Sequence, residues 1–436
     1  MYAGRLHSAG ILHEKEELMS EIANVNFKAL AEKYGTPLVV YDEEKLRERL
    51  QAFTENFKSD SVKTDVIYAS KAFNCKAMIQ LVQEYGCCLD VVSGGELYTA
   101  YKAGFDCSKI FFHGNNKTPA EIRMALELGV GTIVIDNVME AEELLRQIEG
   151  TDYQIRVFLR VNPGIEAHTH QYIVTAHVDS KFGISVLDEK EIAYVTDLFE
   201  GCDNTSFAGI HAHIGSQIFD GQAYVELIRK MFALAAKMKK EYGVNIDTVN
   251  LGGGFAAYYT SADHPIPVDE VCAAILRTAE EENAKINHQI KRICIEPGRS
   301  IVAEAGYNLY RVGYIKKTPN KLYAFVDGGM SDNIRPALYQ AEYDAFIAGR
   351  EDEEKHADYT IAGKCCESGD ILIQSIALPE VHTGDILVMK TTGAYGYSMA
   401  SHYNKLPLPA VVFVKDGKDR VVIERESYDH LISLEK

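Results

Sequence analysis

The sequence predicts an α/β protein: a TIM-type (β/α)8 barrel followed by a C-terminal all-β domain. Short apolar runs recur along the first 300 residues or so, and each ends at a polar or glycine-rich tip. Most gaps between the runs hold one segment of helical periodicity, and strand-then-helix repeated eight times is the pattern of this barrel. The runs are Asp65–Ser70, Cys88–Ser93, Lys109–Gly114, Gly131–Asp136, Ile155–Pro163, Phe207–Gly215, Thr248–Gly254 and Arg292–Gly298.

A second domain is expected because the chain has 436 residues, whereas one barrel takes about 250. After Ala305 strand-like runs predominate, with a hairpin turn at Lys415-Asp416-Gly417-Lys418 and a short helix near the C-terminus. We expect the barrel over residues 37–305, and the β-domain over residues 306–436 together with residues 1–36. The expected β-strands are Tyr307–Ile315, Leu322–Val326, Tyr359–Ala362, Ile371–Ile376, Asp385–Lys390, Ala410–Val414 and Val421–Ile423.

Composition narrows the classes of function. The apolar share of 47% is ample for large cores, and the formal net charge of −18 disfavours nucleic acid or an anionic membrane as partner. The 9 cysteines form no CxxC pair, so neither a disulfide framework nor a zinc ribbon is expected. No apolar run approaches the roughly 18 residues of a membrane span, and residues 1–20 lack the apolar core of a signal peptide. We therefore expect a cytoplasmic protein.

Three segments of the barrel region carry further signals. Thr118-Pro119-Ala120-Glu121 is a capping box with proline at the first helical position, and a charged helix over Asp42–Phe57 precedes the first strand. The stretch from Gly164 to about Val186 is too long for a plain crossover and is rich in histidine and glycine. We expect it to be an active-site loop, and its glycines and histidines motivate the hypothesis that it closes over the substrate.

Lys71 stands directly after the first run, at the end of the barrel where such folds place their chemistry. A lysine there can be a Schiff-base nucleophile if burial and neighbouring cations lower its pKa. Taken alone, an exposed lysine that opens the next helix is the simpler interpretation. The tips of the seventh and eighth runs change this balance.

The seventh run ends in Gly252-Gly253-Gly254, and the eighth ends in Glu296-Pro297-Gly298-Arg299. Loops after these two strands commonly form the phosphate site of a barrel, because bare backbone N–H groups can approach an anion there. Three glycines exceed what one tight turn needs, so phosphate binding is favoured over a turn. Glu296 could pair with a pyridinium nitrogen or form an ion pair with Arg299.

The sixth run ends in His211-Ala212-His213, and strand alternation places both histidines on one face. The pair could bind zinc, or one imidazole could stack on a flat ligand while Ser216 helps to hold phosphate; His211 could also be a hydrogen-bonded core residue. A zinc hydrolase that uses this pair, or His168 and His170, lacks a third ligand with convincing spacing. Lysine, phosphate cradle, stacking ring and carboxylate together match the functional groups of pyridoxal 5′-phosphate (PLP).

Longer motifs resemble a known family. The barrel motifs resemble those of the alanine racemase-like, fold-type III PLP decarboxylases: Tyr68-Ala69-Ser70-Lys71-Ala72, His213-Ile214-Gly215-Ser216, Gly252-Gly253-Gly254 and Glu296-Pro297-Gly298-Arg299. The motifs of the second domain are similar to those of the diaminopimelate decarboxylases: Asp327–Tyr339, Cys366-Glu367-Ser368-Gly369-Asp370 and Gly393-Ala394-Tyr395-Gly396. The resemblance runs from about Tyr34 to Asn404.

The resemblance implies a role for each matching residue. Lys71 would hold PLP covalently, His213 would stack on the ring, and Glu296 would keep its nitrogen protonated. Cys366 would reprotonate the α-carbon. Cys366 and Glu367 would reach the pocket of the other subunit of a head-to-tail homodimer, which Lys181 and Asp370 would bridge. The further residues that would contact the cofactor are Ser216, Gly254, Gly298, Arg299 and Tyr395. The residues that would bind the substrate are Arg299, Arg335, Tyr339, Glu367 and Tyr395.

The implied reaction is PLP-dependent decarboxylation of meso-2,6-diaminopimelate to L-lysine and CO2, the last step of lysine biosynthesis. Arg299 and Arg335 support it because guanidinium forks suit a distal carboxylate, whereas a decarboxylase for ornithine or lysine would need acidic residues there. A non-catalytic PLP carrier is disfavoured by the β-domain with its Cys366-Glu367 motif. Relatives that act on carboxynorspermidine or arginine are a further alternative. No metal ligand is assigned.

Overall fold

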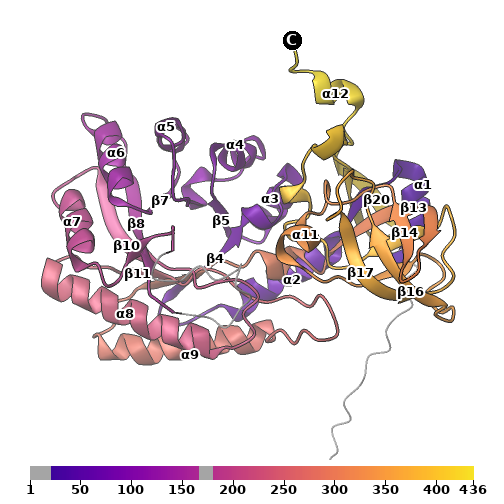
Figure 1. Cartoon of the computed structure of the whole chain (residues 1–436). Helices are drawn as coiled ribbons and strands as arrows, with labels where there is room; N and C mark the ends of the chain where they lie inside the picture. Colours follow the sequence, from indigo (N-terminus) through magenta and orange to yellow (C-terminus); the bar gives the residue numbers. More distant parts are fainter. Residues whose placement is uncertain (1–20, 166–179) are drawn as a thin grey trace, which may run out of the picture.

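The computed structural model describes residues 21–165 and 180–436, and it shows a barrel beside a smaller β-rich domain (Figure 1). All eight expected barrel strands are present and parallel, and β10 pairs with both β8 and β11, which closes the ring. The strands are β4 (Lys63–Ala69), β5 (Cys88–Val91), β6 (Ile110–Phe112), β7 (Thr132–Ile135), β8 (Ile155–Asn162), β10 (Thr205–His211), β11 (Thr248–Asn250) and β12 (Arg292–Ile295). A two-residue strand, β9 (Ile184–Ser185), extends the sheet beside β8.

Helices cover the outside of the barrel, with α8 and α9 lying side by side along one flank (Figure 1). The predicted capping box is confirmed: the Thr118 side chain accepts from the Glu121 N–H, and Pro119 begins α5. The predicted helix before the first strand is confirmed as α2 (Glu43–Asn56), capped by Asp42. The others are α3 (Lys76–Glu84), α4 (Gly94–Lys102), α5 (Pro119–Glu127), α6 (Val138–Ile148), α7 (Glu189–Phe199), α8 (Gln222–Tyr242), α9 (Val268–Lys285) and α10 (Arg299–Val302).

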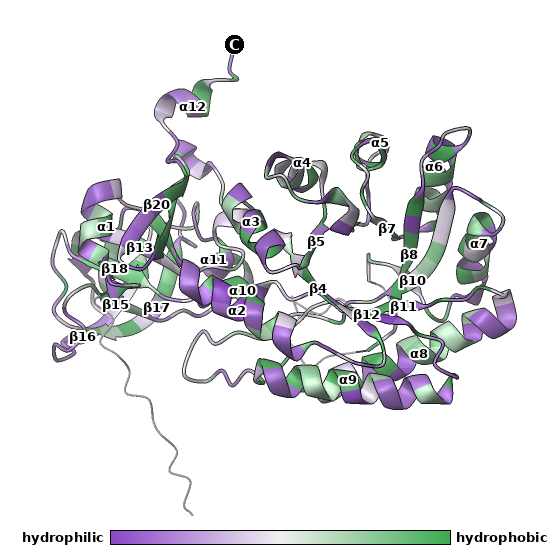
Figure 2. Ribbon diagram, turned by 180° about the vertical axis from the view of Figure 1, so that it is seen from behind, coloured by the Kyte–Doolittle hydropathy of each residue, from purple (hydrophilic) through white to green (hydrophobic). Residues whose placement is uncertain are grey.

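Apolar side chains fill the interior of the barrel, whose strands are mostly green in Figure 2. Gly209 is needed in this layer because a Cβ there would lie 2.4 Å from the Phe158 ring. A packed interior leaves the strand ends as the place for chemistry. The inner cluster consists of Ile67, Phe111, Val134, Phe158, Ala208 and Cys294.

The second domain is built on a nine-stranded mixed sheet in which the long strand β13 pairs with β3, β14 and β18. The predicted hairpin turn is confirmed, and Asp416 and Gly417 take the positive φ that a tight hairpin needs. Its strands are β3 (Leu38–Asp42), β13 (Gly306–Lys317), β14 (Leu322–Val326), β15 (Ala345–Ile347), β16 (Ala357–Ala362), β17 (Ile371–Leu378), β18 (Ile386–Met389), β19 (Ala410–Lys415) and β20 (Lys418–Ile423). Flanking elements are β1 (Glu21–Ile22), β2 (Val25–Asn26), α1 (Phe27–Tyr34), α11 (Arg335–Tyr339) and α12 (Tyr428–Ile432).

One strand of this sheet precedes the barrel in the chain. β3 pairs antiparallel with β13 and parallel with β19, although it lies in the range 37–305 expected for the barrel. We therefore propose that the domain boundary follows β3, near residue 42. Residues 166–179 of the expected loop, which include His168 and His170, lie outside the described residues. No described helix is long and apolar enough to span a membrane, and all nine cysteines are free.

Candidate active site

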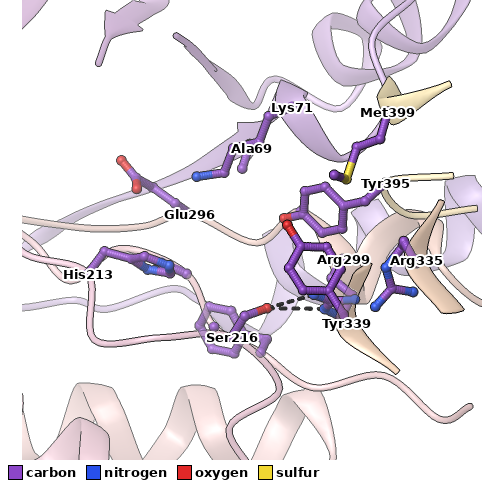
Figure 3. Close-up of a pocket in the computed structure, with 14 residues that line it drawn as sticks. Ala69, Lys71, His213, Ser216, Glu296, Arg299, Arg335, Tyr339, Tyr395 and Met399 are labelled. Carbon is purple, nitrogen blue, oxygen red and sulfur yellow. Dashed lines mark hydrogen bonds between the residues drawn. The ribbon is translucent and has the colours of Figure 1, made fainter. Parts of the chain in front are cut away.

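A cavity of about 200 Å³ opens at the C-terminal ends of the barrel strands and is walled on one side by the second domain (Figure 3). Ten of the twelve residues that the sequence singled out line it. Seven come from the barrel, and Arg335, Tyr339 and Tyr395 come from the second domain. The seven are Lys71, His213, Ser216, Gly254, Glu296, Gly298 and Arg299.

Lys71 lies on a 3-10 turn directly after β4, and its amine points towards Glu296 (Figure 3). Burial acts to lower the pKa of Lys71, but the charges of Asp90, Tyr395 and Glu296 outweigh it, and the pKa is raised. Arg160 is a cation that acts to lower this pKa, but the acidic neighbours prevail. An amine must be unprotonated to attack an aldehyde, so a neighbouring group has to take up its proton.

Glu296 is buried at the tip of β12 with three nitrogen atoms around its carboxylate. Asn250 Nδ2 donates to Oε1 at 2.7 Å, and His211 Nε2 lies 3.1 Å from Oε2. His113 Nε2 lies 2.9 Å from Oε1, though without the alignment of a hydrogen bond. Burial opposes ionisation, but His113 and His211 outweigh it and hold the pKa of Glu296 well below its usual range. The carboxylate thus stays charged and suits a protonated ring nitrogen.

The two histidines of the sixth run have different surroundings. His211 is a buried core residue against Glu296, and burial lowers its pKa to about 4, so the ring is neutral. His213 borders the cavity, and the Gly253 N–H donates to its Nδ1 at 3.2 Å, which places the proton of the neutral ring on Nε2. Among the described residues, the side chains that lie close enough together to bind a metal ion are instead those of His113, His211 and Glu296. All three are buried, whereas a hydrolytic zinc site keeps an open position.

The glycines at the tip of β11 allow the chain segments that follow β10, β11 and β12 to lie close together. Gly254 has φ +102°, and a Cβ there would lie 2.6 Å from Ile218 Cδ1; a Cβ on Gly253 would lie 2.2 Å from the Glu296 carbonyl oxygen. Bare peptide groups therefore form this wall of the cavity. Ser216 Oγ on the same wall accepts from Arg299 Nε at 3.1 Å and Nη2 at 2.9 Å (Figure 3). Hydroxyl, guanidinium and glycine backbone suit a phosphate group, so together with Lys71, His213 and Glu296 the residues present fit PLP.

Arg299 and Arg335 are only 7% and 5% exposed, and both donate to the Tyr259 hydroxyl. Arg335 also donates to the Tyr343 hydroxyl. In the described parts of the chain, neither guanidinium forms an ion pair with a carboxylate. Two buried cations without a counter-charge among the described residues suit an anionic ligand.

Comparison with known proteins fits this geometry. Residues 43–303 match a family model described as the pyridoxal binding domain of pyridoxal-dependent decarboxylases. The chain is 48% identical over 416 residues to diaminopimelate decarboxylase of Bacillus subtilis (strain 168), covering 95% of this chain and 94% of that one. This chain belongs to the diaminopimelate decarboxylase family. The relative from Staphylococcus aureus (strain COL) is 46% identical, with 94% of this chain and 95% of that one covered.

Solved structures of diaminopimelate decarboxylases have the same fold. The enzyme of Helicobacter pylori complexed with L-lysine superposes with a TM-score of 0.85 at 31% identity, covering 94% of this chain and 99% of that one. A lysine/ornithine decarboxylase complexed with cadaverine, from Vibrio vulnificus, has a TM-score of 0.74 at 21% identity, which shows a shared fold alone.

Two predicted site residues of this diaminopimelate decarboxylase family member lie away from the cavity. Cys366 and Glu367 are exposed on the loop between β16 and β17, and the Cys366 N–H donates to Asn404 Oδ1 at 2.7 Å. Asp370 on the same loop is buried, and its carboxylate accepts from the Met330 and Cys365 N–H groups at 2.7 and 2.8 Å. Asp370 thus holds the loop within its own chain, and its expected bridge to Lys181 of another subunit stays a prediction.

The sequence did not reveal several residues that contact the predicted ones, among them His113, Asn250, Tyr259 and Tyr343. His113 and Asn250 stand at the tips of β6 and β11, and this position is the same signal that drew attention to Lys71. Tyr259 and Tyr343 lie in irregular segments, where no periodicity marks them. Only the folded chain shows that both touch the arginines.

Proposed function

We propose that this chain decarboxylates meso-2,6-diaminopimelate to L-lysine and CO2, with PLP as cofactor. The observation that carries the proposal is the pair of buried guanidiniums, Arg299 and Arg335, in the same cavity as Lys71 and Glu296. Such a pair attracts a substrate with a carboxylate remote from its reacting centre, whereas it would repel the distal ammonium of ornithine or lysine. Diaminopimelate has this second carboxylate.

PLP, when bound, supplies the electron sink that decarboxylation requires. We assign its aldehyde to Lys71, its ring face to His213 and its nitrogen to Glu296. The wall of Ser216, Gly254, Gly298, Arg299 and Tyr395 would hold the phosphate. Tyr395 has φ +61°, and strained backbone of this kind collects at ligand sites.

The protein's own contribution is to orient the substrate and to fix charges. Arg299 and Arg335, with Tyr339 beside them, would hold the distal carboxylate, which leaves the opposite centre of the substrate near Lys71. Glu296, kept ionised by its neighbours, would hold a proton at the ring nitrogen. Preorganised charges of this kind need no rearrangement during the reaction.

We further propose that two chains complete each other's sites in a homodimer. Cys366 would deliver a proton to the α-carbon, and Glu367 would hold the distal ammonium. Both are exposed and neither lines the cavity of its own chain, which supports a role in a second copy. We place the enzyme in the cytoplasm, where thiols such as Cys366 stay reduced.

Arg335→Met tests the substrate assignment. Loss of the charge-assisted bonds to the distal carboxylate should lower kcat/KM for diaminopimelate by at least about a hundredfold, while PLP stays bound. Turnover is measured as lysine formation, and PLP content by its visible absorbance. Arg123→Met, at an exposed position of α5, is the matched control and should behave as the wild type. Normal turnover by Arg335→Met would contradict the assignment.

A further inference from the structure

Tyr259 stands between the two arginines of the cavity. Its hydroxyl accepts from Arg299 Nη1 at 2.7 Å and from Arg335 Nη1 at 3.3 Å. The two guanidinium carbons lie 5.7 and 5.1 Å from the centre of its ring. Tyr343 packs edge-on against this ring at 5.5 Å and takes another bond from Arg335. One phenol thus contacts both cations through its oxygen and its aromatic face.

The two guanidiniums repel each other, so the group that bridges them has to offset this repulsion. Two guanidiniums buried side by side are commonly held by a carboxylate, but a carboxylate would cancel charge that an anionic substrate has to use. A phenol accepts a hydrogen bond from each arginine and remains neutral. Its ring face adds a cation–π attraction to both without adding a formal charge. The arrangement therefore holds the forks in place and keeps the cavity positive.

The two arginines also face different parts of the cavity. Arg299 bonds Ser216 on the glycine-rich wall, whereas Arg335 lies on α11 of the second domain. The Tyr259 hydroxyl joins them across the domain boundary. Tyr259 itself is buried in the loop after β11, where its backbone N–H donates to Asp263 Oδ2 at 3.1 Å.

We infer that Tyr259 is a positioning residue that sets specificity for a dicarboxylic amino acid, by holding Arg299 and Arg335 together in a cavity of net positive charge. This inference rests on the proposed function, because it concerns the carboxylate that the two arginines would bind. It assigns Tyr259 no contact with the substrate and no role in proton transfer.

The charge state of Tyr259 gives the inference a pH signature. Burial acts to raise the pKa of Tyr259, but Arg299 and Arg335 outweigh it, and the pKa is lowered. The two arginines face the Tyr259 hydroxyl, and Tyr343 faces its ring. The carboxylate of Asp263, in the same loop, accepts from the Tyr259 backbone N–H and does not contact the hydroxyl. As pH rises through this lowered pKa, a phenolate forms and cancels one positive charge. Affinity for the distal carboxylate should then fall as pH rises.

The test compares the wild-type holoenzyme with Tyr259→Phe. Loss of the bridging oxygen should raise KM for diaminopimelate about tenfold and leave kcat within about threefold, because binding and not chemistry is affected. Affinity for L-lysine, measured by calorimetry, should fall by a similar factor and provides a readout besides activity. The decline in affinity with rising pH should be shallower in the variant than in the wild type. Tyr41→Phe, which removes a buried hydroxyl bonded to Gly393, is the control and should match the wild type.

The outcomes separate the two proposals. A wild type that neither decarboxylates diaminopimelate nor binds L-lysine would overturn the proposed function and this inference with it. A wild type that does both, with a Tyr259→Phe variant equal to it in KM, in lysine affinity and in pH profile, would overturn the inference alone. A fall in kcat at unchanged KM would also overturn it, since that pattern belongs to a group acting in the chemical step.

Discussion

At the scale of single residues, buried neighbours fix the charge of each ionisable side chain in the cavity. Glu296 is kept ionised by His113 and His211, although burial alone would favour its neutral form. His211 is kept neutral by the same burial. Arg299 and Arg335 donate to phenol hydroxyls and form no ion pair with a carboxylate among the described residues. The charges of Glu296 and of the two arginines match the parts of PLP and substrate that we assign to them.

The neutral state of His211 predicts an acid-sensitive stability. Its pKa is about 4 in the folded chain against an ordinary 6.5, so unfolding takes up a proton between these values. The stability that depends on the neutral ring is present above the ordinary pKa and is lost as pH falls towards the folded one. Between about pH 7 and about pH 5 the loss should be about 2 kcal/mol. His211→Gln, which keeps a donor but does not titrate, should lose correspondingly less in urea unfolding.

His264→Gln, at an exposed position, is the control for that experiment and should keep the wild-type slope. Equal slopes for wild type and His211→Gln would show that His211 does not carry this proton uptake. The comparison uses the change with pH, so an unrelated packing loss in the variant does not affect it.

Sequence reasoning found the residues that stand at strand tips and carry reactive groups, such as Lys71 and Glu296. It did not find the residues that contact them, because such contacts depend on which strand ends the barrel brings together. His113 and Asn250, for example, reach Glu296 from the ends of β6 and β11. Nor does the sequence show which charged groups, such as Asp90, decide the direction of the pKa shift of Lys71.

At the scale of elements, the tip of β11 shows why a strand end can form a ligand wall. The three glycines from Gly252 to Gly254 lack Cβ atoms, which would clash with the backbone that follows β10 and β12. The ends of the three strands can therefore lie close together. Three successive glycines made this close approach predictable from the sequence. The place of β3 was not predictable, because a buried apolar strand pairs equally well in either sheet. β15 was missed because three residues carry too little alternation.

A pair of glycine substitutions tests this wall. Gly86 and Gly254 both have positive φ, but a Cβ on Gly86 meets nothing within 4 Å, whereas one on Gly254 meets Ile218 and the Gly215 carbonyl at 2.6 and 2.7 Å. Gly86→Ala should cost about 1 kcal/mol of stability and keep PLP affinity. Gly254→Ala should weaken PLP binding at least about tenfold, because the wall must shift. Equal PLP affinities, from absorbance titrations, would contradict a phosphate site at Gly254.

At the scale of the whole molecule, the site is divided between two domains and, as we propose, between two chains. The barrel supplies Lys71, Glu296 and Arg299, and the second domain supplies Arg335 and Tyr395. The Tyr395 N–H donates to the Ala72 carbonyl at 2.8 Å, one residue from Lys71, so the domains are fastened where the chemistry is expected. Under this proposal, the exposed Cys366 and Glu367 would complete the site of a second chain.

Mixing two inactive variants tests the sharing of sites. Lys71→Ala should lose the visible absorbance of bound PLP and nearly all activity, and Cys366→Ala should keep PLP but turn over slowly. A mixed dimer contains one site with both Lys71 and Cys366, so up to about a quarter of wild-type activity should return after subunit exchange. Controls are each variant exchanged with itself. No recovery in a mixture with demonstrated exchange would argue against shared sites.

The most direct test of the central claim is a coupled assay of lysine and CO2 formation by the wild-type chain with PLP. Meso-diaminopimelate is the substrate, and ornithine, arginine and carboxynorspermidine are run in parallel. The two-arginine cavity predicts turnover of diaminopimelate and none of ornithine or arginine at comparable concentration. Preferred turnover of another of these amines, or no turnover with PLP firmly bound, would contradict it.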